Sequence, residues 1–418
     1  MSKSDYRLTK YACYFSYLSM ASAFCVPPLL FVTFHELYGI SYTLLGTLVL
    51  INYCTQLIID LIFSFFSKRF NVRLTVRVMP LMTSCGLLLF AAAPLLFPDR
   101  IFVGLALGTL IFSVAAGLSE VIVSPIIAAI PSDNPGKDMS LLHSLYGWGV
   151  VTMVLLSSVF FLIFGTENWS VLLVILAVFP LGASLLYFLS PIPDLDFGSA
   201  GKGGQGSRKL GIFLCFGCIF LGSCAESTMS DWISGFMEKA LNVPKTVGDV
   251  LGVAMFAALL ASARTLYARF GKNIIRTIAL GMAGSAVCYL VAGLSGNAVV
   301  SFIACALTGF CAAMLWPGTL IMMEENISSP GVAAYALMAA GGDLGAAVAP
   351  QLLGILVDKI SVADFASSLS SKLSMTPEQI GMKAGMLTAA VFPILGFILI
   401  LFIRKYFSAT RKDKTPEA

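Results

Sequence analysis

The chain has 418 residues, of which 58% are hydrophobic and only 11% charged, and its formal net charge is +4. A soluble domain carries about 25% charged residues, so this composition excludes an ordinary soluble protein and indicates an integral membrane protein. Membrane topology and anionic lipid head groups account for the small positive charge, which requires no nucleic-acid partner.

Twelve apolar segments are long enough to cross a bilayer, because a helical span needs about 20 such residues. The first six cover residues 10–33, 43–66, 75–97, 101–130, 140–164 and 168–190. The second six cover residues 210–237, 246–268, 277–295, 297–323, 332–357 and 382–405. Most of the 26 Lys and Arg residues fall on one side of these spans, which predicts that both termini are cytoplasmic.

A Pro-, Gly- and Ser-rich segment, 191–209, separates the two groups and is typical of a flexible linker. We therefore predict an N-terminal six-helix bundle over 1–190 and a C-terminal bundle over 210–405, followed by a cytoplasmic tail over 406–418. In the longest outer stretch, 358–383, Thr376 and Pro377 predict the cap and first residue of a short helix.

Two short basic loops repeat between the halves. Arg69-Phe70 lies in the first loop and Arg269-Phe270 in the second, and each loop follows the second apolar segment of its half. Both the hydropathy pattern and the basic loops repeat between the halves. This repeat predicts a duplicated six-helix bundle, which is the architecture of a secondary transporter. Arg69 and Arg269 are therefore candidate gating residues.

The second span carries Asn52, Gln56 and Asp60 at intervals of four residues, which places them on one helix face. A charge at mid-bilayer costs about 2.5–3.5 kcal/mol, so such a face must meet a cavity or a partner. For Asn52 and Gln56, lining a cavity and bonding to a neighbouring helix remain open. For Asp60, near the cytoplasmic end, we favour a structural or gating role.

Two glutamates lie deep in predicted spans: Glu120 in the fourth, five residues before Pro125, and Glu226 near the centre of the seventh. A carboxyl group in so dry a site can exchange protons near neutral pH. The alternative is a neutral, hydrogen-bonded structural acid.

Three further charged or titratable residues remain. Asp343 lies in a glycine run of the eleventh span, where it would bind substrate or hold two helices together. His143 starts the fifth span and is either a proton relay or structural. Arg264, near the inner end of the eighth span, is predicted to be a bundle-interface or gate cation.

Trp148, Trp232 and Trp316 lie within spans, whereas Trp169 lies at a predicted membrane interface, as belt tryptophans do. An internal Trp beside polar groups can stack on the apolar face of a sugar ring, or it can simply pack.

The two-half plan with Arg-Phe loops resembles the major facilitator superfamily, and within it the fucose-permease-like sugar/proton symporters. Four groups of residues carry the second resemblance: Glu120 with Ser124-Pro125, Leu141-Leu142-His143 with Gly147 and Gly149, Gly222 with Glu226 and Trp232, and Gly309 with Trp316-Pro317. The glycine run before Pro350 is also similar to that family's eleventh helix. Three positions differ: Ser124 replaces the motif's asparagine, and Lys68 and Ala268 each replace an aspartate before the loop arginine.

The resemblance implies an all-α membrane protein with twelve transmembrane helices in two pseudo-symmetric six-helix bundles, the major facilitator fold. It also implies proton coupling at Glu120 and a substrate cavity that includes Glu226 and Trp232. We therefore predict a secondary active transporter of the cytoplasmic (inner) membrane that moves a small polar solute, a sugar, by proton-coupled symport through alternating access. The alternative is proton-driven efflux of amphipathic compounds.

We expect no cofactor beyond the proton gradient and no metal site, and we expect a monomer whose partners are the small-molecule substrate and the lipid bilayer. A membrane enzyme would need a clustered nucleophile or metal set, and a receptor would need a sizeable soluble module. Neither is visible in the sequence, which predicts no catalytic residue.

Overall fold

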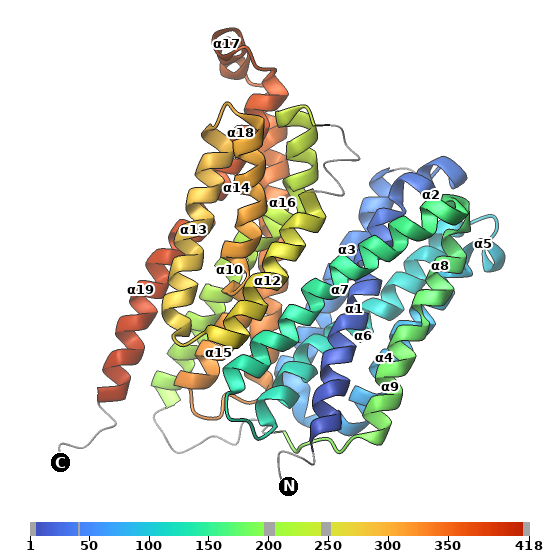
Figure 1. The fold of residues 1–418 in the computed structure, drawn as a ribbon, viewed down its shortest axis with the longest axis vertical. Coiled ribbons are helices and arrows are strands. Elements are labelled where there is room, and N and C mark those ends of the chain that lie inside the picture. Colours follow the sequence, from blue (N-terminus) through green and yellow to red (C-terminus); the bar gives the residue numbers. More distant parts are fainter. Residues whose placement is uncertain (1–5, 41, 196–204, 244–251, 413–418) are drawn as a thin grey trace. The chain divides into compact units, whose positions relative to one another are not determined.

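The computed structural model describes residues 6–40, 42–195, 205–243 and 252–412, and every regular element in these ranges is a helix. The middle of the predicted linker, the start of the predicted eighth span and the end of the predicted tail lie outside the described residues. The chain divides into two compact units, Met1–Ser199 with Gly331–Ala340, and Ala200–Pro330 with Gly341–Ala418 (Figure 1).

The first unit holds the first six predicted spans. Its α-helices are α1 Arg7–Leu29, α2 Phe31–Tyr38, α3 Tyr42–Phe66, α4 Val72–Ala91, α5 Ala93–Leu96, α6 Ile101–Ala129, α7 Pro135–Phe164, α8 Trp169–Leu176 and α9 Val178–Leu189. Two short 3-10 helices, η1 Ser67–Arg69 and η2 Thr166–Asn168, precede α4 and α8.

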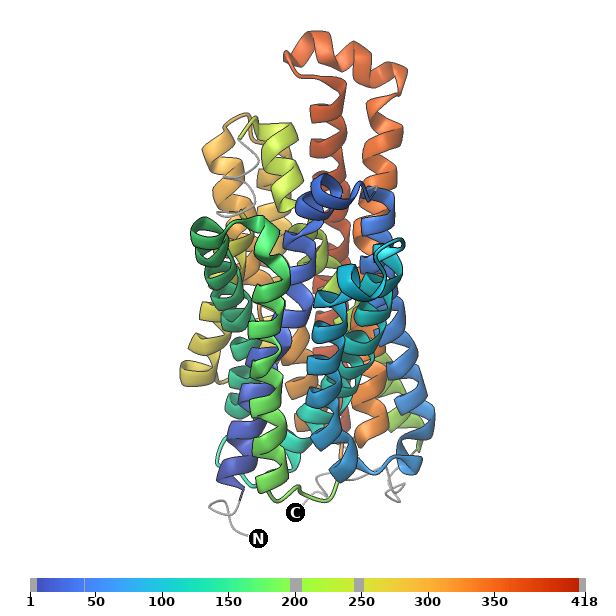
Figure 2. The same cartoon turned by 90° about the vertical axis from the view of Figure 1, so that its right-hand side faces the viewer.

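The later spans form α10 Gln205–Leu241, α12 Ala254–Phe270, α13 Ile274–Leu294, α14 Ala298–Ala312, α15 Leu315–Asn326, α16 Val332–Ser361, α17 Asp364–Leu373, α18 Pro377–Ala389 and α19 Val391–Lys412. The first residues of α16 group with the first unit and the rest with the second. Figure 2 shows α17, in orange-red, lying across the ends of α16 and α18.

Among the described residues, ten helical stretches are long and apolar enough to cross a membrane. The other two predicted spans, the first and the eighth, correspond to α1 and to the 17-residue α12. Large apolar side chains such as Phe65, Leu162 and Leu294 are more than two-thirds exposed on these helices, as expected where lipid replaces water. The helices therefore carry the outward-facing apolar surface of a membrane protein.

Proline explains why several predicted spans are two helices rather than one. The sixth span breaks at Ala177, three residues before Pro180, and the twelfth breaks at Ala390, three residues before Pro393. Each proline lacks the amide that would bond the carbonyl one turn earlier, so the helix opens at that point. The same break at the same place in both halves agrees with a duplicated bundle.

The two repeated loops end in the same helix cap. Asn71 accepts a hydrogen bond from the amide of Leu74 at the start of α4, and Asn273 accepts one from Arg276 at the start of α13. An asparagine in this position satisfies one of the amides that a helix start leaves unpaired. The loop repeat seen in the sequence is therefore also a structural repeat.

Glycines bring neighbouring helices close in both units. An added Cβ on Gly86 of α4 would lie 2.7 Å from the backbone nitrogen of Phe112 in α6. An added Cβ on Gly281 of α13 would lie 2.5 Å from the backbone carbonyl oxygen of Cys311 in α14. Close approach at small residues is the usual way that helices pack inside a bilayer, where no hydrophobic force drives association.

Three local expectations change. Thr376 caps its helix with a full capping box, but that helix is α18, the start of the twelfth span, and the separate short helix is α17. Trp169 is 1% exposed and packs edge-on against Phe34, so it belongs to a buried aromatic cluster rather than to an interfacial belt. The linker was predicted to be flexible, but its first residues are bonded to α1, because the hydroxyl of Thr9 donates a hydrogen bond to the backbone carbonyl of Pro191.

Candidate functional site

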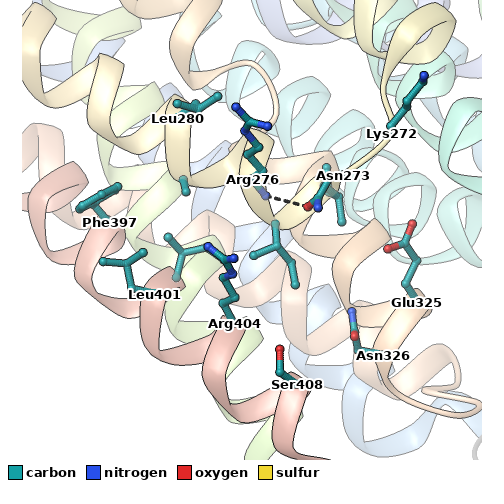
Figure 3. A pocket seen from close by; sticks show the side chains of 14 residues that line it. Lys272, Asn273, Arg276, Leu280, Glu325, Asn326, Phe397, Leu401, Arg404 and Ser408 are labelled. Atoms are coloured by element: carbon teal, nitrogen blue, oxygen red, sulfur yellow. Dashed lines mark hydrogen bonds between the residues drawn. The ribbon is translucent and has the colours of Figure 1, made fainter. Parts of the chain in front are cut away.

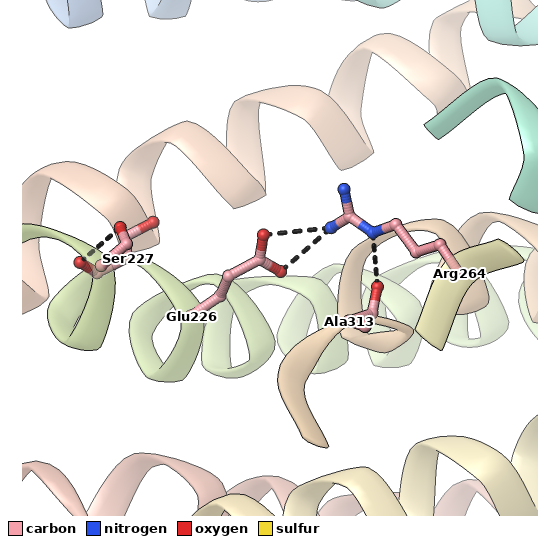
Figure 4. A network of polar contacts seen from close by, with 5 residues as sticks. Glu226, Ser227, Arg264 and Ala313 are labelled. Atoms are coloured by element: carbon pink, nitrogen blue, oxygen red, sulfur yellow. Dashed lines mark hydrogen bonds and ion pairs between the residues drawn. The ribbon is translucent and has the colours of Figure 1, made fainter. Parts of the chain in front are cut away.

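The second unit buries an ion pair between two residues that the sequence assigned to different roles. Arg264 of α12 donates from Nη2 to both carboxylate oxygens of Glu226 in α10, at 3.0 and 3.3 Å (Figure 4). The side chain of Arg264 is 5% exposed and that of Glu226 is 19% exposed. The guanidinium is thus enclosed, while the carboxylate keeps an accessible edge.

A helix break fixes the position of Arg264. Pro317 has no amide, so the carbonyl of Ala313 one turn earlier has no donor within its own helix. Arg264 Nε supplies that donor, at 2.7 Å from the Ala313 oxygen (Figure 4). The junction between α14 and α15 therefore orients the guanidinium toward Glu226.

The electrostatics of this pair follow from its burial. Taking two opposite charges out of water is costly, and the cost is recovered only when they pair with good geometry and further hydrogen bonds. Arginine remains charged under all ordinary conditions. A proton on Glu226 would leave the Arg264 guanidinium as an uncompensated buried cation, so this carboxylate is better suited to hold a ligand than to carry a proton.

The glycine run of α16 accommodates aromatic rings. An added Cβ on Gly342 would overlap the ring of Trp316, and one on Gly354 would lie 3.1 Å from the ring of Trp232. Trp232 also donates from Nε1 to the carbonyl of Pro350, at 3.1 Å. Its polar atom is therefore engaged in linking α10 to α16, which favours packing over ligand stacking for Trp232.

Trp316 packs against Gly342, and Asp343 is the next residue of α16. Trp316 is half-buried and comes directly after the α14–α15 break that orients Arg264. Asp343 is 5% exposed in α16. The closest backbone approach in this run is at Gly345, where an added Cβ would lie 2.5 Å from the carbonyl of Phe220 in α10. The predicted close helix contact exists, but it lies two residues beyond Asp343.

The candidate site residues of the first unit form a hydrogen-bonded group instead of an ion pair. Ser124 of α6 lies 3.3 Å from His143 Nε2 in α7 and 3.4 Å from the hydroxyl of Tyr17 in α1. The rings of Tyr17 and His143 meet edge-on, with centroids 5.2 Å apart. Glu120 precedes Ser124 by four residues, so it shares this face of α6, and it is half-buried.

His143 is not at a helix start. The helix begins at Pro135, five residues before the predicted boundary, because Asn134 caps it by accepting from the amide of Lys137. His143 therefore lies more than two turns inside α7 and is 6% exposed. Trp148, five residues later in the same helix, is 37% exposed.

The polar face of α3 packs on α6. Ser113 lies 2.6 Å from Asn52 Oδ1, to which it donates, and an added Cβ on Gly117 would lie 3.2 Å from the backbone of Gln56. Gln56 and Asp60 are 1% and 0% exposed. For Asn52 and Gln56 these contacts favour the helix-bonding alternative, and the gating role of Asp60 stays a prediction.

The two loop arginines are exposed, and each lies over a phenylalanine ring. The guanidinium carbon of Arg69 is 5.4 Å from the centroid of Phe66, and that of Arg269 is 5.3 Å from the centroid of Phe270. Their gating role also stays a prediction.

Sequence reasoning missed one charge pair in the first unit. Lys10 of α1 lies 2.5 Å from Asp138 of α7, and Ser132 donates to the other carboxylate oxygen at 2.6 Å. Asp138 is 6% exposed. Lys10 is the first residue of the first predicted span and Asp138 lies two residues before the fifth, so the search for intramembrane charges passed over them. A helix start at Pro135 would have been the signal that Asp138 lies inside α7.

The site residues thus form two separate groups. In the second unit Glu226 pairs with Arg264, which bonds to the α14–α15 junction that Trp316 follows in the chain. In the first unit His143 and Ser124 meet on the face that carries Glu120. Among the described residues, no group of three or more His, Cys, Asp or Glu side chains has the arrangement of a metal site.

Comparison with known proteins gives a family and a fold. The model of the Major Facilitator Superfamily matches residues 13–350. No curated protein sequence matches the chain.

Three solved structures show the fold. FucP, a fucose:proton symporter of E. coli, matches in its outward conformation with a TM-score of 0.75, 14% identity and coverage of 96% of this chain and 99% of its own. The human organic anion transporter MFSD10 matches with a TM-score of 0.71, 14% identity and coverage of 94% and 99%. The proton:xylose symporter XylE has the same TM-score and identity, with coverage of 94% and 96%. The predicted fold is therefore confirmed.

Proposed function

Because the chain belongs to the Major Facilitator Superfamily, whose members are membrane transporters, we propose that it imports a sugar or a similar small polyhydroxy solute together with protons. The solved structures with this fold include two sugar:proton symporters, which is the context for the proposal. Alternating access of the two units would move the solute, as is general for transporters built from repeated bundles.

The observation that carries the proposal is the buried Glu226–Arg264 pair with its accessible carboxylate edge. A hydroxyl group both donates and accepts hydrogen bonds, so a polyol can bond to a paired carboxylate and guanidinium without bringing in a net charge. Trp316 offers an apolar ring at the same junction, and such rings stack on the carbon face of sugars. These three residues are our proposed substrate contacts.

Proton coupling is assigned to Glu120. Glu120 is half-buried in α6 on the face that carries Ser124, and Ser124 lies 3.3 Å from Nε2 of His143. Protonation of Glu120 would remove the cost of carrying a bare carboxylate through an occluded state. An inward proton gradient would then drive solute accumulation.

The first experiment is counterflow in proteoliposomes against a panel of hexoses, deoxyhexoses and pentoses, because exchange requires no driving ion. Exchange of one sugar would establish the substrate class. An absence of exchange across the panel, from protein that elutes as a single folded species, would contradict the sugar proposal. The same liposomes would then be tested for proton-driven efflux of amphipathic compounds.

The coupling role is tested with Glu120→Gln. This variant should lose proton-driven accumulation of the identified sugar but retain its exchange, because the glutamine keeps the shape of the site and cannot take up a proton. The matched control is Glu167→Gln, which removes one carboxylate from an exposed position in the same unit. Full accumulation in Glu120→Gln would remove Glu120 from the coupling role.

A further inference from the structure

A cavity of about 630 Å³ lies in the second unit where the ends of α13, α15 and α19 meet (Figure 3). Lys272 and Arg276 line it from the start of α13, and Arg404 lines it from α19. Figure 3 shows Leu280, Phe397 and Leu401 on one side of the two arginines, and Lys272, Glu325 and Asn326 on the other. The cavity is therefore apolar at one end and polar at the other.

A second cavity, of about 600 Å³, adjoins the first. The two share Leu401, Arg404 and Ser408, and the second adds Lys405. The combined groove thus carries four cationic side chains. In the described part of the chain, none of the four lies within salt-bridge distance of a carboxylate, and Glu325 is the acidic residue that lines the groove.

The groove lies where the exposed face of α19 changes from apolar to basic. Ile394, Ile398, Leu401 and Phe402 are at least 40% exposed on this face. Less than one turn later come the exposed cations Arg404 and Lys405. Apolar side chains face hydrocarbon and Lys or Arg side chains reach to the head groups, so this change marks the edge of the hydrocarbon layer.

We propose that this groove binds an anionic phospholipid from the leaflet on the side of the C-terminus. The phosphodiester would lie between Arg276 and Arg404, near the start of α13, whose amides also favour an anion. An acyl chain would lie along Leu280, Phe397 and Leu401. The apolar end favours a phospholipid over free phosphate, and the excess of cations favours an anionic over a zwitterionic head group.

The test is native mass spectrometry of the full chain, titrated with phosphatidylglycerol or phosphatidylcholine of matched acyl chains. Inorganic phosphate forms a third titration. Each basic side chain near an anionic lipid contributes roughly 5-fold in affinity, so Arg276→Gln with Arg404→Gln should weaken phosphatidylglycerol binding about 25-fold. The control is Arg100→Gln with Lys372→Gln, which removes two exposed cations elsewhere.

Selective binding of phosphatidylglycerol that falls in the first double variant and not in the control would support the proposal. Equal affinity for both lipids, equal losses in both double variants, or phosphate binding as tight as lipid binding would each overturn it. Thermal unfolding of the same proteins without lipid shows that the variants are folded. Since all four mutated side chains are exposed, their melting temperatures should match that of the wild type.

Discussion

The two units share a frame and differ in the polar groups that they bury. Both have an asparagine-capped third span, close glycine crossings and a proline break in the last span. In the second unit the candidate site is the buried Glu226–Arg264 ion pair, whereas in the first it is the hydrogen-bonded group of Tyr17, Ser124 and His143. A duplicated scaffold can therefore keep its helix ends and crossings while its interior chemistry diverges.

The largest expected effect comes from breaking the ion pair. Arg264→Gln leaves Glu226 as a buried carboxylate without its cation, and it removes the donor to Ala313, so it should destabilise the protein by about 3–5 kcal/mol. Arg264→Met combined with Glu226→Leu removes both charges of the pair and should recover most of that loss. Thermal unfolding measures both variants. If the double variant were as unstable as the single one, charge compensation would not explain the pair.

The next effect concerns the glycine face of α16. Gly342→Ala places a methyl group in the ring of Trp316 and should cost about 1–3 kcal/mol by overpacking. Gly235→Ala in α10 is the matched control, because nothing lies within 4 Å of its added Cβ. That control should be neutral or stabilising by about 0.5–1 kcal/mol. Trp316→Leu should rescue Gly342→Ala, and a failure to rescue would place the strain elsewhere.

The shared frame predicts equal effects in the two halves. Asn71→Ala and Asn273→Ala each remove one helix cap and should each cost about 1 kcal/mol. Hydrogen exchange of the Leu74 and Arg276 amides should accelerate in the corresponding variant only. Markedly unequal stability losses in the two variants would show that the two caps share a geometry but contribute differently to stability.

The smallest expected effect lies in the Tyr17, Ser124 and His143 group of the first unit. Ser124→Ala removes two long contacts, at 3.3 and 3.4 Å, and should cost at most about 1 kcal/mol. Thermal unfolding of Ser124→Ala and Arg264→Gln under the same conditions compares the stability lost in the two units. A loss as large as that of Arg264→Gln would mean that the hydroxyl holds a network as costly to break as an ion pair.

The sequence predicted the spans well because hydrophobicity is a property of each segment alone. It also located the repeated loops, where Asn71 and Asn273 each accept a hydrogen bond from an amide three residues later. It did not predict that α7 begins at Pro135, because the polar first turn of that helix, with Asp138, lies beyond the apolar run. The Lys10–Asp138 pair was missed for that reason.

The candidate site was predicted residue by residue but not as contacts. The sequence identifies Glu226 and Arg264 as charges inside the membrane. The free-energy cost of such a charge implies that each has a partner, but it does not specify which residue the partner is. The family resemblance implies a substrate cavity that includes Trp232, yet the indole nitrogen of Trp232 donates a hydrogen bond to the carbonyl of Pro350. Which face of a helix meets which neighbour depends on crossing geometry, and the period of one helix does not contain that information.

By itself, the sequence determined that this is a membrane protein of two repeated halves, because apolar length, charge bias and capping residues act locally. Only the tertiary structure decided that Arg264 meets Glu226. That contact requires Pro317 to open a helix and expose the Ala313 carbonyl, which then holds the guanidinium against a third helix. Three segments far apart in the chain must be in place at once, and no single segment specifies the result.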